Sequence, residues 1–532
     1  MTKEGRRYMH ALTVAAAVFL LAGPSSNAVA SQARSPLWGD LEPGPHAVGF
    51  RQLERYDYSR VHRLARDLDG RPRAGERARP IRVSIWYPAE PSSRAPLTWG
   101  DYAAMAAGEE RFGSLTPERV RLGQDTVFGF PLFRDLHPDQ RRRLAAIPAA
   151  AVRDAVPLRG PFPLVLYSLG STFLAHVTPE HLASHGYVVV QSPRVGATAG
   201  FPPENRDRED LVTKIRDMDF LIDVMHEFPA ADVHRLGVVG FSAGGRWALS
   251  EAMQNPDVRA VVSLDSVMLF KDPTLEAWKQ LPLFNLEAVR VPVLHCIRRA
   301  WVPLEDASLW DSLKYAERTY AVFEQAGLDH LDFQSAGWAL ELAGARPELR
   351  PKVGSAFTLW SRWTLAFLDL HVKGDGKARE VLDRMGTPQD APAGFVTVSR
   401  KAAAVPPPTI AEVMNAIADD NMDSVERVCR AGLRETGKPP VPENVLNLAG
   451  YNLLFSGRRP EALRLLSLNA EMFPHSGNAL DSLADAYQAA GDRARARELA
   501  VEAKALIEKD TSLDLDRKKR ILENIETKLH GD

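Results

Sequence analysis

The chain has 532 residues, a formal net charge of −2, and a composition that is 45% hydrophobic and 25% charged. A chain of this length is too long to fold around one hydrophobic core, so we expect two or three folded domains. Basic residues are not interleaved with aromatic ones in any stretch, which argues against a nucleic-acid partner.

The first thirty residues have the pattern of a secretory signal peptide. A basic start is followed by an apolar run over 11–22 and by an Ala-x-Ala cleavage site that ends at Ala30. The apolar run is too short to span a bilayer and no other stretch is long enough, so we expect no transmembrane anchor. We therefore predict a signal peptide over 1–30 and an exported protein, either periplasmic or secreted.

Short apolar runs and helical patterns alternate through the first two thirds of the chain. We predict strands over 47–50, 81–87, 164–167, 187–190, 236–239, 260–264, 291–297 and 319–323, and helices over 208–227 and 355–373. Continuous Val, Leu and Ile runs separated by helices are typical of a mainly parallel sheet covered on both faces. We therefore predict a doubly wound α/β domain over 31–385.

A stretch with helical pattern, 99–156, interrupts this alternation. It contains several Pro and Gly breaks and lies between two predicted strands. We expect it to form an insertion over the sheet, as a cap or a lid.

The composition changes after residue 385. Residues 386–408 contain several prolines, three of them consecutive at 406–408, which is typical of a semi-rigid linker. Beyond them, four pairs of positions are spaced by 34 residues: Gly450 and Ala484, Leu453 and Tyr487, Gly457 and Gly491, and Ala462 and Ala496. This period predicts a tetratricopeptide-like all-helical domain over 409–532, which could bind a protein partner.

The two cysteines, Cys296 and Cys429, fall in different predicted domains. Export would permit a disulfide. Their separation nevertheless predicts two unpaired thiols.

A Gly-x-Ser-x-Gly sequence follows the predicted strand over 236–239. The strand, a tight turn at Ser242 and a helix start together form the context of a nucleophile elbow. Gly240 and Gly244 supply the space where strand and helix approach each other closely. We predict that Ser242 is a catalytic nucleophile at the carboxyl edge of the sheet.

A serine hydroxyl needs a base that takes its proton and an acid that orients the base. Where such an elbow occurs, the three residues follow in the chain order Ser, acid, His, on loops at strand ends. His330 follows the predicted strand over 319–323 and is the predicted base. Asp265 directly follows the strand over 260–264 and is the predicted acid, while Asp306, after the next strand, is the alternative.

Other polar residues near these positions have structural interpretations. His295 lies inside an apolar strand, which predicts a buried histidine with hydrogen-bond partners. Asp329 and Asp332 flank His330 and are expected to cap its loop. His181 and His185 are spaced like metal ligands but have no evident third ligand, so we predict no metal site.

The tetrahedral oxyanion of acyl transfer needs two N–H donors. One is expected from Ala243, directly after the nucleophile. The second should come from the turn after the strand over 164–167, from the amide of Ser171 or of Gly170.

Several motifs together resemble one branch of a known superfamily. They are 167–170, 182–189, 240–244, 264–265 and 329–333, with 44–50 and 83–88 upstream. They are similar to the platelet-activating-factor acetylhydrolase and dienelactone-hydrolase-like α/β-hydrolases. The resemblance covers about 44–375 and implies a Ser-Asp-His triad whose acid follows the strand after the elbow, which favours Asp265. It also implies hydrolysis of short acyl esters.

The chain departs from this family at two positions. The family usually has a His-Gly pair where Leu169-Gly170 stand, and true dienelactone hydrolases use a cysteine where this chain has Ser242. The segment 99–156 and the helical repeats lie outside the family core.

We therefore predict an exported serine hydrolase that cleaves carboxylic esters, short acyl esters above all, without a metal or an organic cofactor. The expected partner of the site is a small-molecule ester. Two alternatives stay open: a serine peptidase or amidase with the same triad, and a non-catalytic binding protein that acts through the helical repeats.

Overall fold

The structure, a computed structural model, describes residues 34–62, 77–108, 112–168, 171–193, 208–511 and 514–530. The predicted signal peptide lies outside these residues. The chain divides into two compact units, 1–403 and 404–532, each with its own hydrophobic core.

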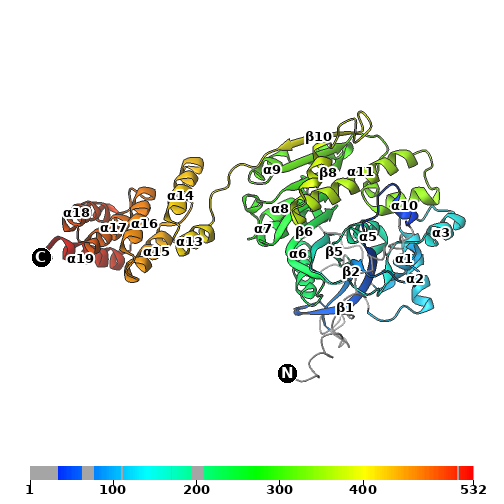
Figure 1. Ribbon diagram of the computed structural model, residues 1–532, viewed down its shortest axis with the longest axis horizontal. Coiled ribbons are helices and arrows are strands. Elements are labelled where there is room, and N and C mark those ends of the chain that lie inside the picture. Colours follow the sequence, from blue (N-terminus) through cyan, green and yellow to red (C-terminus); the bar gives the residue numbers. More distant parts are fainter. Residues whose placement is uncertain are drawn as a thin grey trace, which may run out of the picture. The chain divides into compact units, whose positions relative to one another are not determined.

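The first unit is built on a ten-stranded sheet with the order β10-β9-β8-β7-β6-β4-β5-β2-β1-β3 (Figure 1). Its strands are β1 (Ala47–Val61), β2 (Ala78–Ala89), β3 (Val152–Arg153), β4 (Phe162–Ser168), β5 (Val188–Gln191), β6 (Ala231–Phe241), β7 (Val258–Leu264), β8 (Val293–Arg298), β9 (Arg318–Phe323) and β10 (Val396–Lys401). The six strands from β4 to β9 pair in parallel, whereas β2 joins them antiparallel through β5. The prediction of a mainly parallel sheet is confirmed.

Helices cover both faces of this sheet. Alternate side chains of each strand point to opposite faces, and those on each face pack with helices into a separate hydrophobic core. In β4, Val165 and Tyr167 pack into one core, while Leu164 and Leu166 pack into the other. The first core includes α5 (Val177–Ser184), α10 (Ser335–Ala343) and α11 (Arg350–Leu368). The second includes α6 (Arg208–Met225), α7 (Gly244–Gln254), α8 (Pro273–Lys279) and α9 (Ala307–Ser312). Burial on both faces explains why the parallel strands are continuous apolar runs.

The insertion is helical, as predicted. It contains α1 (Trp99–Ala104), α2 (Pro117–Gly129) and α3 (Pro138–Ala145). Helix α1 contacts both α2 and α3, and α3 lies beside α10 (Figure 1). Trp99 packs against Phe133 at 5.3 Å between ring centroids and against Phe173 of α4 (Thr172–Ala175) at 6.4 Å. The insertion therefore shares the first core and contacts the segment that follows β4.

The range predicted as a linker overlaps the sheet. Val396–Lys401 form β10, which pairs antiparallel with β9 along six residue pairs. Its alternation of apolar and polar residues (Val396, Val398) is typical of an edge strand. The first unit therefore extends to Ala403.

The second unit is entirely helical in its described part. Its helices are α13 (Ile410–Ala418), α14 (Met422–Thr436), α15 (Glu443–Phe455), α16 (Arg459–Met472), α17 (Gly477–Ala490), α18 (Arg493–Lys509) and α19 (Leu515–His530). Helices α15 and α17 begin 34 residues apart (477 − 443), and so do α16 and α18 (493 − 459). Gly457 and Gly491 follow α15 and α17 with φ of 81° and 91°, a left-handed conformation that glycine adopts without strain.

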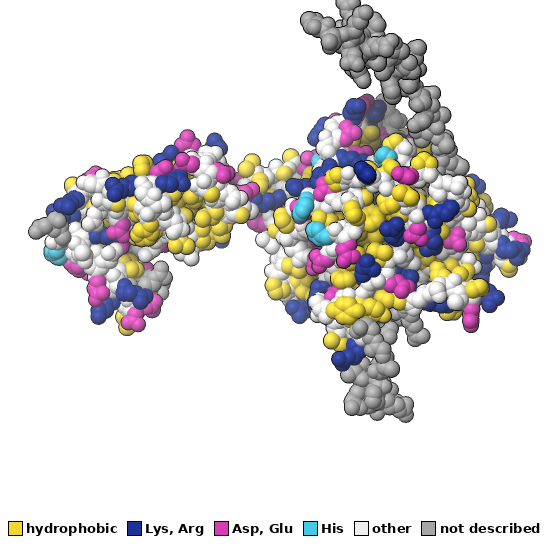
Figure 2. All heavy atoms as spheres, turned by 60° about the horizontal axis from the view of Figure 1, so that its bottom comes forward, with side chains coloured by type: hydrophobic (Ala, Val, Ile, Leu, Met, Phe, Trp, Pro, Cys, Tyr) yellow, Lys and Arg dark blue, Asp and Glu magenta, His cyan; other side chains and the backbone are white. Residues whose placement is uncertain are grey.

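The surface of the described residues carries both charged and hydrophobic side chains. On the face shown in Figure 2, acidic and basic side chains are interspersed, in agreement with the small net charge. No helix in the described ranges is long and apolar enough to cross a membrane. Cys296 and Cys429 are both free and buried, which confirms the prediction of two unpaired thiols.

Candidate active site

Ser242 lies in the turn between β6 and α7 with a φ of 55°. A positive φ is strained for a residue with a side chain. The turn is held against β7, since Ser242 N donates to Leu264 O at 3.3 Å and Val267 N donates to Ser242 O at 3.0 Å. Gly240 is required there, because a Cβ at this position would lie 2.4 Å from the carbonyl oxygen of Gly244. This geometry is that of a nucleophile elbow.

His330 and Asp265 are joined by a hydrogen bond. His330 Nδ1 donates to Asp265 Oδ2 at 2.8 Å. The Asp265 side chain is fully buried, whereas that of His330 is 23% exposed. With its proton on Nδ1, the imidazole leaves Nε2 able to accept a proton.

The imidazole lies beside the elbow. Its ring stacks on Phe241, the residue before Ser242, with centroids 4.4 Å apart and an angle of 19° between the ring planes. Ser242 and His330 both lie in the described part of the chain, and no hydrogen bond joins their side chains in the structure. In enzymes without substrate such bonds are often long and tighten only when substrate binds.

The alternative acid, Asp306, lies elsewhere. It is the N-cap of α9, and its carboxylate accepts hydrogen bonds from Ser308 N at 3.1 Å and Ser308 Oγ at 2.7 Å. The Asp306 carboxylate therefore caps α9 and does not bind His330.

The structural interpretations of the other residues are confirmed. His295 is buried between Ser263 Oγ and Glu305 Oε1, each at 2.8 Å from a ring nitrogen. Asp329 and Asp332 form a capping box around the short helix that contains His330.

The histidine pair near the N-terminal strands contacts the backbone. His181 Nε2 and His185 Nε2 lie 2.9 Å and 3.1 Å from Glu42 O. Nowhere in the described part of the chain do three or more His, Cys, Asp or Glu side chains gather in a way that could hold a metal ion.

The predicted oxyanion donors are only partly described. Ala243 is the N-cap residue of α7, so its amide belongs to the positive end of that helix. Ser171 is the N-cap residue of α4 and is buried, and its Oγ has no hydrogen-bond partner within the described ranges. Gly170 lies outside the described residues.

Three residues of the site were not singled out from the sequence: Phe241, Arg298 and Trp301. The Trp301 ring contacts the imidazole of His330 at 4.4 Å between centroids. Arg298 N donates to Asp265 Oδ1 at 3.0 Å. Since Arg298 ends β8 at the same edge as Asp265, its position directly after the strand predicted over 291–297 was the available signal.

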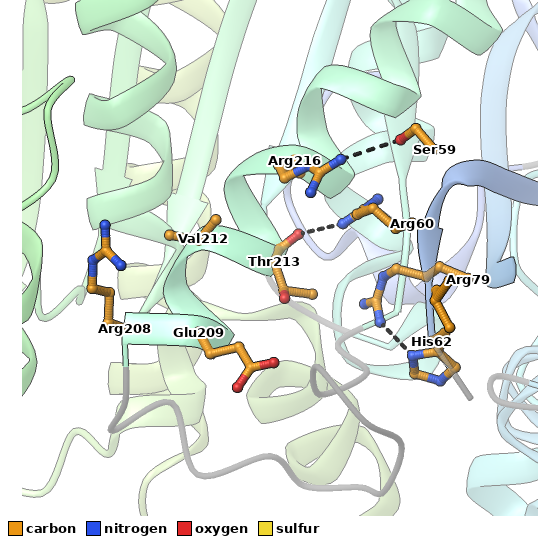
Figure 3. A pocket seen from close by; sticks show the side chains of 10 residues that line it. Ser59, Arg60, His62, Arg79, Arg208, Glu209, Val212, Thr213 and Arg216 are labelled. Carbon is orange, nitrogen blue, oxygen red and sulfur yellow. Dashed lines mark hydrogen bonds between the residues drawn. The ribbon is translucent and has the colours of Figure 1, made fainter. Parts of the chain in front are cut away.

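A cavity of about 550 Å³ lies apart from these residues, between the β1–β2 hairpin and the start of α6 (Figure 3). Arginines line this cavity, but several of them already form ion pairs with acidic side chains. Arg79 binds both oxygens of Asp217 at 2.7 Å, and Arg60 contacts the same carboxylate at 3.0 Å. Burial opposes ionisation of Asp217, but Lys214, Arg79 and Arg60 outweigh it and hold its pKa at about 2. We interpret this cluster as an ion-pair network that fixes the hairpin to α6.

Comparisons with known proteins found one matching family and similar solved structures. Residues 168–287 match the model of the dienelactone hydrolase family, a range that includes Ser242 and Asp265 and ends before His330. A ferulic acid esterase from Streptomyces cinnamoneus, known from its structure, is 20% identical; the match covers 68% of this chain and 98% of that chain with a TM-score of 0.46. No curated protein matches the chain.

Proposed function

We propose that this chain, an α/β-hydrolase whose segment 168–287 matches the dienelactone hydrolase family, is an exported serine hydrolase of carboxylic esters. The observation that carries the proposal is the buried Asp265 bonded to His330 at 2.8 Å, beside a serine on a strained elbow. An acid, a base and a nucleophile brought together at one edge of a sheet are the parts that acyl transfer requires.

In the proposed mechanism, His330 Nε2 takes the proton of Ser242 as the hydroxyl attacks the ester carbonyl. Asp265 orients the imidazole and stabilises the imidazolium that forms. The amides of Ala243 and Ser171 hold the tetrahedral oxyanion. The imidazolium then protonates the leaving alcohol as its bond to the acyl carbon breaks. In the second half, His330 takes a proton from a water that attacks the acyl carbon, and the imidazolium returns this proton to Ser242 Oγ as the carboxylic acid leaves.

Short acyl esters are the proposed substrates. The motif resemblance to acetylhydrolases supports this choice. The serine nucleophile also separates the chain from dienelactone hydrolases proper, in which a cysteine attacks. We further propose that the helical repeats bind a protein partner, since arrays with a 34-residue period present extended binding surfaces.

The test is hydrolysis of p-nitrophenyl esters from acetate to laurate by the full chain, with Ser242→Ala and His330→Ala as controls. We expect turnover to decrease with acyl length and each substitution to reduce it by about 10³-fold or more. Turnover that persists in Ser242→Ala would contradict the proposal. If none of the p-nitrophenyl esters is hydrolysed but a fluorophosphonate probe labels Ser242, the result would favour the peptidase or amidase alternative.

A further inference from the structure

Arg298 ends β8 beside the carboxylate that holds His330. In addition to the backbone contact with Oδ1, its Nε lies 3.2 Å from Asp265 Oδ2 as an ion pair. Oδ2 is the oxygen that also accepts from His330 Nδ1. A permanent cation and the imidazole therefore share one buried carboxylate oxygen.

The same guanidinium also holds the segment that carries His330. Arg298 Nη1 donates to Asp329 Oδ1 at 3.2 Å, and that oxygen accepts from His330 N at 2.5 Å. The guanidinium carbon lies 4.3 Å from the ring centroid of Trp301, whose ring contacts the imidazole. Arg298 therefore contacts Asp265 directly and is linked to His330 through Asp329 and Trp301.

We propose that Arg298 is a positioning residue that fixes Asp265 and opposes the protonation of His330. The proposal rests on the proposed function, because it takes His330 as the base. An arginine guanidinium is not deprotonated in proteins, so its positive charge does not change with pH. Neutral His330 is the form that accepts the proton of Ser242, and the cation therefore extends activity to lower pH.

The other charged groups near the imidazole act in the opposite direction. Asp265 Oδ2 accepts from the imidazole Nδ1, and Asp329 Oδ1 accepts from the backbone N of the same histidine. A carboxylate beside an imidazole in general favours the protonated ring. Asp332, behind Asp329, is already paired with Arg346 at 2.6 Å. Arg298 forms ion pairs with both Asp265 and Asp329, each at 3.2 Å.

The test is the pH dependence of the rate at which a fluorophosphonate probe labels Ser242 in the full chain. This rate reports activation of the serine without assuming an ester substrate. In Arg298→Gln we expect the pH of half-maximal rate to rise by about 0.5–1 unit, because protonation of His330 is no longer opposed. Arg298→Lys keeps the charge and should keep the half-maximal pH, while its maximal rate falls because an ammonium group cannot make all three contacts.

Arg299→Gln is the matched control, because Arg299 is the adjacent arginine and pairs with Glu324. Its half-maximal pH should equal that of the wild type. Arg298→Met, which keeps an aliphatic stem on Trp301, is the second neutral variant if Arg298→Gln does not fold. An unchanged half-maximal pH in a folded neutral variant overturns the proposal, even if the maximal rate falls, since a merely structural role would produce that result. Failure of wild-type Ser242 to be labelled at any pH would instead overturn the proposed function, and this inference with it.

Discussion

At the scale of single residues, two of the four described non-glycine residues with a positive φ lie directly after neighbouring strands. Ser242 follows β6 and Asp265 follows β7, and both have a positive φ, of 55° and 37°. Such conformations cost about 1–3 kcal/mol each and persist where the surroundings hold them. Here the backbone N of Asp265 donates to Cys296 O at 2.7 Å. Both strained residues belong to the proposed triad, as expected if the strain serves to present their side chains.

The contact of Asp265 with His330 leads to a prediction that separates the two acids considered from the sequence. Asp265→Asn keeps the shape of the side chain but removes its charge, so the imidazole can adopt the wrong tautomer. We expect kcat for p-nitrophenyl acetate to fall by about 10³–10⁴-fold with little change in KM. Asp306→Asn is the control and should retain wild-type kcat. A loss in Asp306→Asn with normal activity in Asp265→Asn would reverse the assignment.

At the scale of elements, one buried carboxyl group joins the insertion to helix α5. Glu180 of α5 accepts hydrogen bonds from Tyr102 Oη at 2.7 Å, Ala150 N at 2.9 Å and Ala151 N at 3.3 Å. Trp38 Nε1 approaches the same group at 3.4 Å. Burial raises the pKa of Glu180 from 4.5 to about 7, although these donors oppose the rise.

The raised pKa predicts a pH dependence of stability with a definite sign. Between pH 4.5 and 7 the folded state binds more protons at Glu180 than the unfolded state, so this contribution to stability falls as pH rises. The full effect is about 3 kcal/mol. Thermal unfolding of wild type and Glu180→Gln at pH 5 and pH 8 measures it. Buried His176 and His181, whose pKa values burial lowers to about 3, contribute with the opposite sign, and they are common to both proteins.

The informative quantity is therefore the difference between the two proteins. We expect the wild type to lose more stability than Glu180→Gln, or to gain less, between pH 5 and pH 8. The variant should be less stable at pH 5, because its amide group faces backbone and indole donors. Equal pH dependences in the two proteins would show that Glu180 is ionised in the folded state.

At the scale of the whole molecule, the chain contains two units with separate cores and a sheet that is complete at Lys401. A chain truncated after Ala403 retains all ten strands and the proposed triad. We expect it to keep the Tm of the catalytic unit and the rate of Ser242 labelling. Truncation after Met385 removes β10, exposes the edge of β9, and should lower Tm by several degrees. Loss of labelling in the longer truncated chain would contradict the independence of the first unit.

Local features of the structure were accessible from the sequence because they depend on short-range periodicity. The elbow around Ser242, the parallel strands and the 34-residue helical period each follow from spacing within a few dozen residues. The sequence predicts a linker where β10 lies, because a short edge strand beside Pro-rich segments has a weak local signal. Its pairing with β9, more than seventy residues earlier, supplies the hydrogen bonds that define it.

By itself, the sequence determined the doubly wound α/β class with a mainly parallel sheet, the strand–turn–helix context of Ser242 and a short set of acids and histidines at strand ends. The order of strands and the residue types at their ends are local properties, and hydrophobic burial preserves them in the fold. Only the tertiary structure decided which of these groups meet. Asp265 and His330 are 65 residues apart, and the loops after β7, β8 and β9 converge only when the strands pair in register. The same register brings Arg298 and Trp301 around the acid–base pair, a contact between side chains that no spacing along the chain encodes.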